Sequence, residues 1–250
     1  MSSSAPQTAS VLNLSGNALL TALPAADQGR LAAHLERVSL RLGEMLYEPG
    51  KPPQHAYFPI TAIISLHCAL SSGVSSETAS VGNDGMVGVA LFMGGSSMAS
   101  SAVVQISGEA YRLDANIFRA EFERLGALGR IMLRYAQALI MQTGQSVVCY
   151  RHHTIEQQLC RWLLATVDRS PSLALTMTQE LIANTLGVRR ESITEVASRL
   201  QQAGVIRYRR GHISIEDRAG LELRACECYE VTRREARRLL ALKLDGAVRS

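Results

Sequence analysis

The stretch that decides the fold is residues 176–203, TMTQELIANTLGVRRESITEVASRLQQA. Its apolar residues recur with a period near 3.6, as they do along one face of a helix. The period breaks once, at Leu186-Gly187-Val188, where glycine adopts the positive φ of a tight turn at low cost. The stretch therefore predicts two short helices joined by one turn, with helix-turn-helix spacing.

Polar residues stand at the expected start of each helix. Thr178 is a suitable N-cap for the first helix. The second helix opens with Arg189, Arg190, Glu191 and Ser192. In DNA-binding helix-turn-helix proteins, the N-terminal residues of the second helix contact base edges in the major groove. The cation-rich start of this helix therefore favours a DNA-reading role.

The residues behind this stretch predict a hairpin. Two β-prone runs, residues 205–208 and 212–215, flank Arg209, Arg210 and Gly211. Arginines at the tip of such a wing are suited to phosphate oxygens. Together the two helices and the wing indicate a winged-helix DNA-binding domain. The alternative is an ordinary helical hairpin with a solvated basic loop.

Composition and charge agree with a folded DNA-binding protein. The chain has 250 residues, of which 47% are hydrophobic and 19% charged, which is typical of a globular protein with two domains. Residues 1–150 hold nine Lys and Arg against ten Asp and Glu, whereas residues 151–250 hold 17 against 12. The basic half is the half that contains the predicted winged helix.

The sequence carries no sign of a membrane segment, a secretory signal or a metal site. It has no run of 18 apolar residues, and its start, MSSSAPQTAS, lacks the basic and apolar regions of a signal peptide, so we expect a cytoplasmic protein. The five cysteines are scattered and are expected to be reduced. Cys226 and Cys228 are too closely spaced for a zinc pair without further partners, so we expect no metal and no cofactor.

The N-terminal half has the texture of an antiparallel sandwich or barrel. Residues 1–15 are rich in Ser and Ala and predict a flexible tail, and residues 18–35 look helical with a break at Pro24. Short β-prone segments then alternate with turn signals. The expected strands are residues 38–42, 45–47, 56–58, 62–70, 77–81, 86–91, 102–105 and 110–113.

Helical patterns return after Asp114, which can cap a short helix that runs to Glu123. A long helix is expected from about Leu125. Two sets of residues on it fall on heptad positions and suggest a dimer helix: Leu125, Met132, Leu139 and Ser146, with Leu128, Tyr135, Gln142 and Cys149. The alternative is a helix that packs only on its own domain. A further helix is expected at residues 154–168.

The order of a roll of short strands, a long helix and a winged helix resembles the Crp/Fnr family of bacterial transcription regulators. The resemblance extends from about residue 19 to residue 215. In the N-terminal half it rests on residues 43–44, 46–50, 57–59, 81–82 and 85–88, and in the C-terminal half on residues 178–200 and 203–206.

The resemblance implies an α+β fold: an N-terminal antiparallel β-roll of the jelly-roll, cyclic-nucleotide-binding type, a long dimerisation helix and a C-terminal winged helix-turn-helix. We accordingly divide the chain into a tail at residues 1–15, a sensor at 16–124, a dimerisation helix at 125–152, and a DNA-binding domain with a C-terminal helical extension at 153–250. The implied partners are a double-stranded DNA operator, a second copy of the chain, RNA polymerase and an unknown small-molecule effector.

The family's DNA-reading residues can be carried over to matching positions. Arg190 takes the place of a guanine-reading arginine and Glu191 that of a carboxylate that accepts from cytosine, which agrees with the chemistry of these base edges. Glu195 departs from the pattern, because many members carry a second arginine there. The full set expected at the DNA is Thr178, Gln179, Arg189, Arg190, Glu191, Ser192, Thr194, Glu195, Arg199, Arg209, Arg210 and His212.

The expected ligand pocket departs further from the family. Members that bind cyclic nucleotides follow the glycine at position 88 with a glutamate for the ribose, and carry an arginine for the cyclic phosphate before a Ser-Ala or Thr-Ala pair. Here Val89 follows Gly88, and Ser100 precedes Ser101. Without the arginine, a charge-assisted pair of about 1.5–3 kcal/mol is lost. The pocket is degenerate, and cyclic AMP is not the expected effector.

The cysteines and histidines bear on other kinds of sensor. The family's N-terminal iron–sulfur cysteines are missing, since the first cysteine is Cys68. His67 could ligate haem, but a satisfied or exposed histidine beside a buried Cys68 is the preferred interpretation. His153 could titrate, meet a carboxylate or be solvated. The rival functions are a ligand- or partner-binding β-roll whose winged helix serves protein contacts, and an enzyme, for which no catalytic motif is found.

Overall fold

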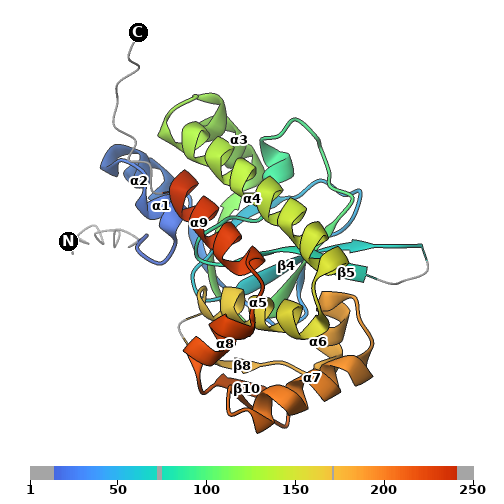
Figure 1. Ribbon diagram of the computed structural model, residues 1–250. Coiled ribbons are helices and arrows are strands. Elements are labelled where there is room, and N and C mark those ends of the chain that lie inside the picture. The colour runs from blue at the N-terminus through green and yellow to red at the C-terminus, as the bar shows by residue number, and fades with distance from the viewer. Residues whose placement is uncertain (1–13, 72–74, 171, 241–250) are drawn as a thin grey trace, which may run out of the picture.

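The computed structural model describes residues 14–71, 75–170 and 172–240. The winged helix lies at one end of the molecule, the β-roll occupies the centre, and the long helix α4 crosses the roll with the last helix, α9, beside it (Figure 1). None of the described helices is long and apolar enough to cross a membrane. Of the predicted N-terminal tail only Leu14 and Ser15 are described, and Leu14 is buried in the core.

The expected antiparallel β-roll is confirmed. One sheet has the strand order β1-β7-β3 and the other the order β2-β6-β4-β5, and all pairings are antiparallel. The strands are β1 (Glu36–Leu40), β2 (Met45–Tyr47), β3 (His55–Pro59), β4 (Ile63–Ala69), β5 (Ser75–Val81), β6 (Ser101–Ile106) and β7 (Gly108–Asp114). Phe58, Ile64 and Val104 are buried between the sheets and adjoining helices.

The prediction of a strand at residues 86–91 is wrong. The segment forms a single bridge from Val87 to Tyr57 and then a 3-10 turn, η1 (Val89–Leu91). Gly88 has a φ of 113°, which a β-branched or bulky residue would not adopt readily, and this turns the chain out of the sheet. A β-prone composition could not reveal this turn.

Short helices close the ends of the roll. They are α1 (Ala18–Thr21), α2 (Ala25–Ala32) and α3 (Ala115–Glu123). The buried side chain of Asn17 caps α1 and donates hydrogen bonds to the carbonyls of Pro59 and Gly85, both at 2.9 Å. Asp114 caps α3 as expected, since its carboxylate accepts from two backbone N–H groups of the first turn.

The long helix α4 (Ala127–His152) begins two residues after the expected start, because Leu125 has a positive φ of 53°. Most of the predicted dimer seam is covered by the protein's own chain. Leu128, Met132 and Tyr135 are buried in the core of their own chain, and Ser146 and Cys149 are also buried. For these residues the alternative, a helix packed on its own domain, is correct.

A different stripe of α4 is exposed. Leu133, Ile140 and Val147 follow at seven-residue intervals and are 59–63% exposed. Gln137 and Gly144 lie between them and are exposed too. Spacings of four and three residues place all five on one side of the helix.

The C-terminal half is a winged helix with an extension. After α5 (Ile155–Val167) come β8 (Ala174–Thr176), α6 (Gln179–Leu186), α7 (Arg190–Gln202), β9 (Ile206–Arg209), β10 (His212–Ile215), α8 (Arg218–Arg224) and α9 (Cys228–Leu240). Thr154 starts α5 with a capping box. The wing sheet has the order β8-β10-β9, so β8 is a third strand that the sequence interpretation missed.

Buried polar groups join the winged helix to the β-roll. Gln105 donates one hydrogen bond to the carboxylate of Glu77 at 3.0 Å and another to the hydroxyl of Thr185, on α6, at 3.1 Å. Ser65 also donates to Glu77. Burial raises the pKa of Glu77 to about 7, although the two hydrogen bonds and the charge of Arg161 act in the opposite direction.

We predict that Glu77 makes folding stability depend on pH. The pKa of Glu77 is about 7 in the folded protein and 4.5 ordinarily, so the folded state holds its proton more tightly. The stability gained from this proton is fully present below pH 4.5 and is lost as the pH rises through about 7. Glu77→Gln stays neutral and can still accept hydrogen bonds, so it should stabilise the protein at about pH 8 by on the order of 2–3 kcal/mol. Urea unfolding at several pH values measures this, with Glu48→Gln on the surface as control. Parallel pH profiles for Glu77→Gln and the unmodified protein would contradict it.

Candidate nucleic-acid interface

The helix-turn-helix forms as the apolar period predicts. Ile182 and Leu186 of α6 pack with Ile193 and Leu200 of α7 in one buried cluster. Thr178 caps α6, with its hydroxyl accepting from the Leu181 N–H at 3.1 Å. Gly187 takes a φ of 67° between the helices. The core thus fixes the angle at which the second helix leaves the domain.

The first turn of α7 presents its polar residues to solvent. Arg190, Glu191 and Thr194 are exposed and Ser192 is half-buried. Arg189 is the exposed N-cap residue of the helix. Within the described part of the chain, neither arginine forms an ion pair. Their guanidinium groups therefore remain available to an external acceptor.

Four predicted DNA contacts, Gln179, Thr194, Glu195 and Arg199, are engaged within the protein. Thr194 donates a hydrogen bond to the Gln179 side chain at 2.8 Å and so links α7 to α6. Arg199 pairs with Glu195 at 2.6 Å and with Glu156 of α5 at 3.3 Å. The carboxylate at position 195, where many members carry arginine, thus neutralises a cation of its own helix.

The wing is a tight hairpin. Arg210 and Gly211 both have positive φ, 49° and 80°, as a two-residue turn of this type requires. Arg209 and Arg210 are exposed at its tip and make no ion pair with any described residue. His212 pairs with Arg209 next to the turn, and its Nδ1 lies 3.2 Å from the Thr176 hydroxyl of β8.

Tyr208 is a residue that the sequence interpretation missed. Its hydroxyl donates to the Met177 carbonyl at 3.1 Å, and its N–H donates to Gln201 at 2.7 Å. Burial raises the pKa of Tyr208, and the nearby charge of Arg190 acts in the opposite direction. Tyr208, on strand β9 of the wing, therefore lies near Arg190 at the start of α7. Only the sheet pairing reveals this position.

The winged helix is docked against the β-roll. A crevice of about 370 Å³ has Thr178 and Arg210 on one side and Leu42 and His67 of the roll on the other. A Cβ added to Gly187 would lie 2.3 Å from the Ser76 hydroxyl of β5, so the turn touches the roll directly. Two of the predicted DNA contacts thus border the protein's own sensor.

His67 and Cys68 do not form a ligand pair. His67 is half-buried, and burial lowers its pKa. Cys68 is exposed rather than buried, because it stands next to the end of β4, whose last residues lie outside the buried part of the strand. The expectation of a buried Cys68 is wrong.

The degenerate ligand pocket is closed by the protein's own side chains. Val89 is buried, and Ser100 is 7% exposed with its hydroxyl 3.4 Å from that of Tyr47. Ser101 begins β6 beside it. Burial raises the pKa of Tyr47, so its phenol stays neutral. The part of the roll where a cyclic phosphate would need a cation therefore presents two neutral hydroxyls.

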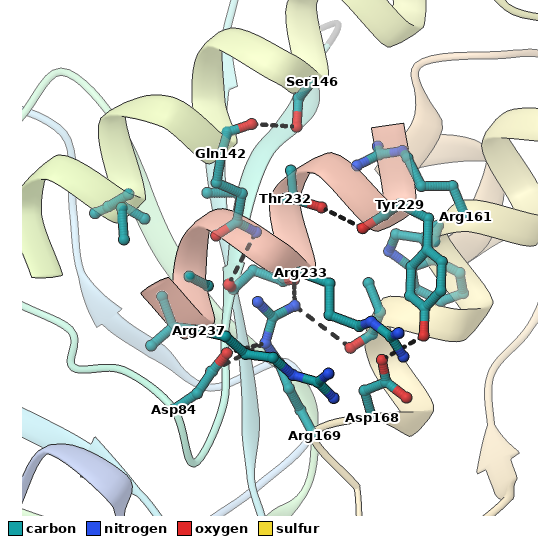
Figure 2. A pocket seen from close by; sticks show the side chains of 18 of the residues that line it. Asp84, Gln142, Ser146, Arg161, Asp168, Arg169, Tyr229, Thr232, Arg233 and Arg237 are labelled. Carbon is teal, nitrogen blue, oxygen red and sulfur yellow. Dashed lines mark hydrogen bonds and ion pairs between the residues drawn. The ribbon is translucent and has the colours of Figure 1, made fainter. Parts of the chain in front are cut away.

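A second cavity, of about 450 Å³, lies between β5, α4, α5 and α9 (Figure 2). Asp84 is paired with Arg169, and Asp168 with Arg218. Arg237 makes no ion pair with any described residue, and Arg161 has a buried Nε without a hydrogen-bond partner. Trp162 also lines this cavity and has an unpaired Nε1. Among the described residues, the cavity thus offers one unpaired guanidinium, that of Arg237, and two N–H donors without hydrogen-bond partners, Arg161 Nε and Trp162 Nε1.

Two domain families match the chain in the order that the structure shows. Residues 37–124 match the cyclic nucleotide-binding domain, and residues 157–224 match the Crp-like helix-turn-helix domain. A solved structure described as a Crp/Fnr-family transcriptional regulator from Eubacterium rectale is similar over 84% of this chain and 98% of its own, with a TM-score of 0.65 and 15% identity. The chain belongs to the Crp/Fnr family of transcriptional regulators.

Other solved regulators share the Crp/Fnr fold. FixK2 from Bradyrhizobium japonicum covers 77% of this chain and 98% of its own, with a TM-score of 0.64 and 17% identity. The c-di-GMP-responsive regulator CLP from Xanthomonas campestris covers 77% and 99%, with a TM-score of 0.58 and 16% identity. No curated protein sequence is similar enough to the chain to count as a match. Crp/Fnr regulators bind DNA through the helix-turn-helix and are not enzymes, as the sequence predicts.

Proposed function

We propose that this regulator binds a specific DNA sequence as a homodimer and that its β-roll does not respond to cyclic AMP. The observation that carries the proposal is the unpaired, exposed Arg190 at the first turn of α7. An arginine at the N-terminal end of a recognition helix reaches guanine O6 and N7 in the major groove. The sensor then spans residues 16–124, the dimerisation helix residues 125–152, and the DNA-binding domain residues 153–250.

The remaining polar residues divide into two roles. Glu191 is exposed beside Arg190 and can accept from cytosine N4. Thr178, Arg209 and Arg210 are suited to phosphate contacts, which add affinity without sequence information. The other proposed members of this surface are Gln179, Arg189, Ser192, Thr194, Glu195, Arg199 and His212.

The homodimer is proposed to form through the exposed stripe of α4. Leu133, Ile140 and Val147 repeat every seven residues, the spacing at which two long helices interlock. Exposed Gly144 lets a partner backbone approach closely, since a Cβ there would meet no atom within 4 Å. A two-fold dimer would present two α7 helices to two half-sites of an operator. Contact with RNA polymerase is proposed on the family resemblance alone.

DNA binding requires the winged helix to move away from the β-roll on this proposal. Thr178 and Arg210 border the crevice against the sensor. In this position the β-roll would obstruct a duplex that contacts both residues. The hinge is the break between α4 and α5, where His153 has an extended backbone. An effector would act by changing the balance between the docked and the released positions.

The effector is proposed to be an anion that occupies the cavity beside Trp162. Arg237 lines this space without an ion pair to any described residue, and Arg161 lines it with the carboxyl of Glu77 as its nearby acidic group. The nucleotide pocket of the roll, by contrast, has neutral Ser100 and Tyr47 where a phosphate needs a cation. One solved relative is named for its response to c-di-GMP, so a Crp/Fnr fold can serve effectors other than cyclic AMP.

Replacing Arg190 should change sequence preference, not only affinity. We expect Arg190→Ala to lose roughly 1 to 3 kcal/mol of binding free energy and to relax the preference at one position in each half-site. Arg209→Ala should weaken all sequences alike and reduce the salt dependence. Selection of bound duplexes from random DNA, repeated with each variant, measures both effects. If Arg190→Ala leaves binding and regulation intact, the winged helix serves protein contacts instead.

Charged residues in the α4 stripe should produce a monomer. The double variant Leu133→Asp, Ile140→Asp would bury two carboxylates of each chain in the proposed interface. The cost of removing these charges from water exceeds the stabilisation that helix pairing provides. Light scattering should then give a mass near 27.1 kDa. Leu223→Asp is the matched control, because Leu223 is a leucine of α8 that is 86% exposed. A dimer that survives the double variant would refute the assignment.

Cyclic AMP should alter neither DNA affinity nor the emission of Trp162, the only tryptophan of the chain. An anion that occupies the cavity should change that emission, because Trp162 lines it. A fluorescence screen of nucleotides and organic anions tests both statements. Arg237→Ala should abolish the response and Arg234→Ala, on another side of α9, should retain it. Stronger DNA binding with cyclic AMP would contradict the proposal.

A further inference from the structure

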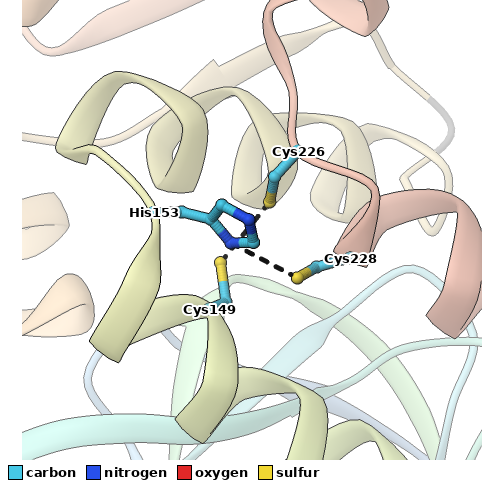
Figure 3. A group of neighbouring side chains, drawn as sticks. All are labelled: Cys149, His153, Cys226 and Cys228. Atoms are coloured by element: carbon cyan, nitrogen blue, oxygen red, sulfur yellow. Dashed lines mark hydrogen bonds between the residues drawn. The ribbon is translucent and has the colours of Figure 1, made fainter.

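Four side chains with metal-binding atoms meet where the long helix ends (Figure 3). Cys149 is on the last turns of α4 and His153 is its C-cap residue. Cys226 precedes α9 and Cys228 is its first residue. The three cysteines are at most 4% exposed, and the His153 side chain is 14% exposed. The sequence predicts that Cys226 and Cys228 bind no metal without further partners, and the fold brings two possible partners, Cys149 and His153, beside them.

The distances among these atoms suit one tetrahedral ion. The four donor atoms lie within 4.8 Å of one another. The sulfurs of Cys149 and Cys226 are 3.6 Å apart, and the Cys228 sulfur is 3.5 Å from Nδ1 of His153. Zinc–ligand bonds of about 2.3 Å to sulfur and 2.0–2.1 Å to nitrogen require sulfur pairs about 3.8 Å apart and sulfur–nitrogen pairs about 3.6 Å apart. The protein already holds the donors at nearly these separations.

Neighbouring polar groups orient the imidazole and one of the sulfurs. Nε2 of His153 lies 3.3 Å from the carboxylate of Glu227, so its proton can be donated there while Nδ1 keeps a free lone pair. Gln145 donates a hydrogen bond to the Cys228 sulfur at 3.0 Å. Gln158 donates to the His153 carbonyl at 2.9 Å and fixes the residue's backbone.

Two other uses of the cluster fit less well. An iron–sulfur cluster places inorganic sulfide and several irons between its cysteines, and donor atoms this close leave no room for them. A disulfide between Cys149 and Cys226 would need the sulfurs to approach to about 2.05 Å. It would also not account for the position of Cys228 and His153 beside them. Three sulfurs and one imidazole are a common donor set of structural zinc.

We propose that Cys149, His153, Cys226 and Cys228 bind a single Zn²⁺ ion, which fastens the start of α9 to the end of α4. The ion has no open coordination position, so its role is structural. It lies at the hinge proposed above and holds α9 against both α4 and α5. The site stands on its own geometry and does not depend on DNA binding.

The test begins with the unmodified full-length protein. Purified without chelators, it should contain one zinc per chain by mass spectrometry. Titration with p-hydroxymercuribenzoate should release that zinc as thiols are consumed. Protein exchanged into Co²⁺ should show the intense visible bands of tetrahedral cobalt and a sulfur-to-cobalt charge-transfer band. These measurements need no variant and remain decisive if a variant fails to fold.

Variants then assign the ligands. Cys226→Ser should lose the stoichiometric zinc and the charge-transfer band, and it should unfold at a lower temperature than the unmodified protein. Cys160→Ser is the matched control, since Cys160 is a buried thiol outside the cluster, and it should keep both. Cys68→Ser should do so as well. Substoichiometric zinc with no tetrahedral cobalt spectrum, iron with acid-labile sulfide, or a Cys149–Cys226 disulfide in the purified protein would each overturn the proposal.

Discussion

The buried contact between the β-roll and the winged helix is the constraint on which the rest of the structure depends. Gln105 bridges Glu77 of the roll and Thr185 of α6, and Arg169 at the end of α5 reaches back to Asp84. Buried hydrogen-bonded groups are costly to separate, because each partner then needs water or a new acceptor. The two halves of the chain therefore have a defined mutual position rather than a loose tether.

On the proposed function, that position lets one set of residues serve a docked and a released state. When Thr185 is bonded to Gln105, the turn at Gly187 touches Ser76 and the wing borders the roll. If DNA binding releases these contacts, as proposed above, the same surface of α6 and the wing becomes free for a duplex. Few direct bonds join the halves, so modest differences in ligand affinity could shift this balance.

Local features of the fold followed from sequence because each depends on neighbouring residues. Thr178 and Asp114 cap helices through groups three or fewer residues away, and Gly187 is demanded by the turn itself. The heptads of α4 misled because both faces of that helix carry apolar residues. Its buried face meets the roll, whereas the exposed stripe lies at Leu133 and Ile140. A period cannot distinguish a core contact from a subunit contact.

Features assembled from distant segments could not be predicted. The 3-10 turn at Val89 follows from the φ of Gly88, and β8 exists only because β10 offers it a free edge. The cysteine and histidine cluster joins residues 149 and 226, which are 77 positions apart. Only the i and i+4 spacing of Cys149 and His153 on one helix hinted at it.

The packing of α9 has a consequence for how the chain can be divided. This helix follows the winged helix in sequence, yet it lies along α4 and also contacts α5 (Figure 1). Tyr229 and Leu239 are buried there. A fragment cut at the start of α5 would uncover that apolar side, whereas one that retained the second half of α4 would keep it covered. The domain boundary in the sequence, at the start of α5, therefore differs from the boundary of the unit that folds cooperatively, which includes part of α4.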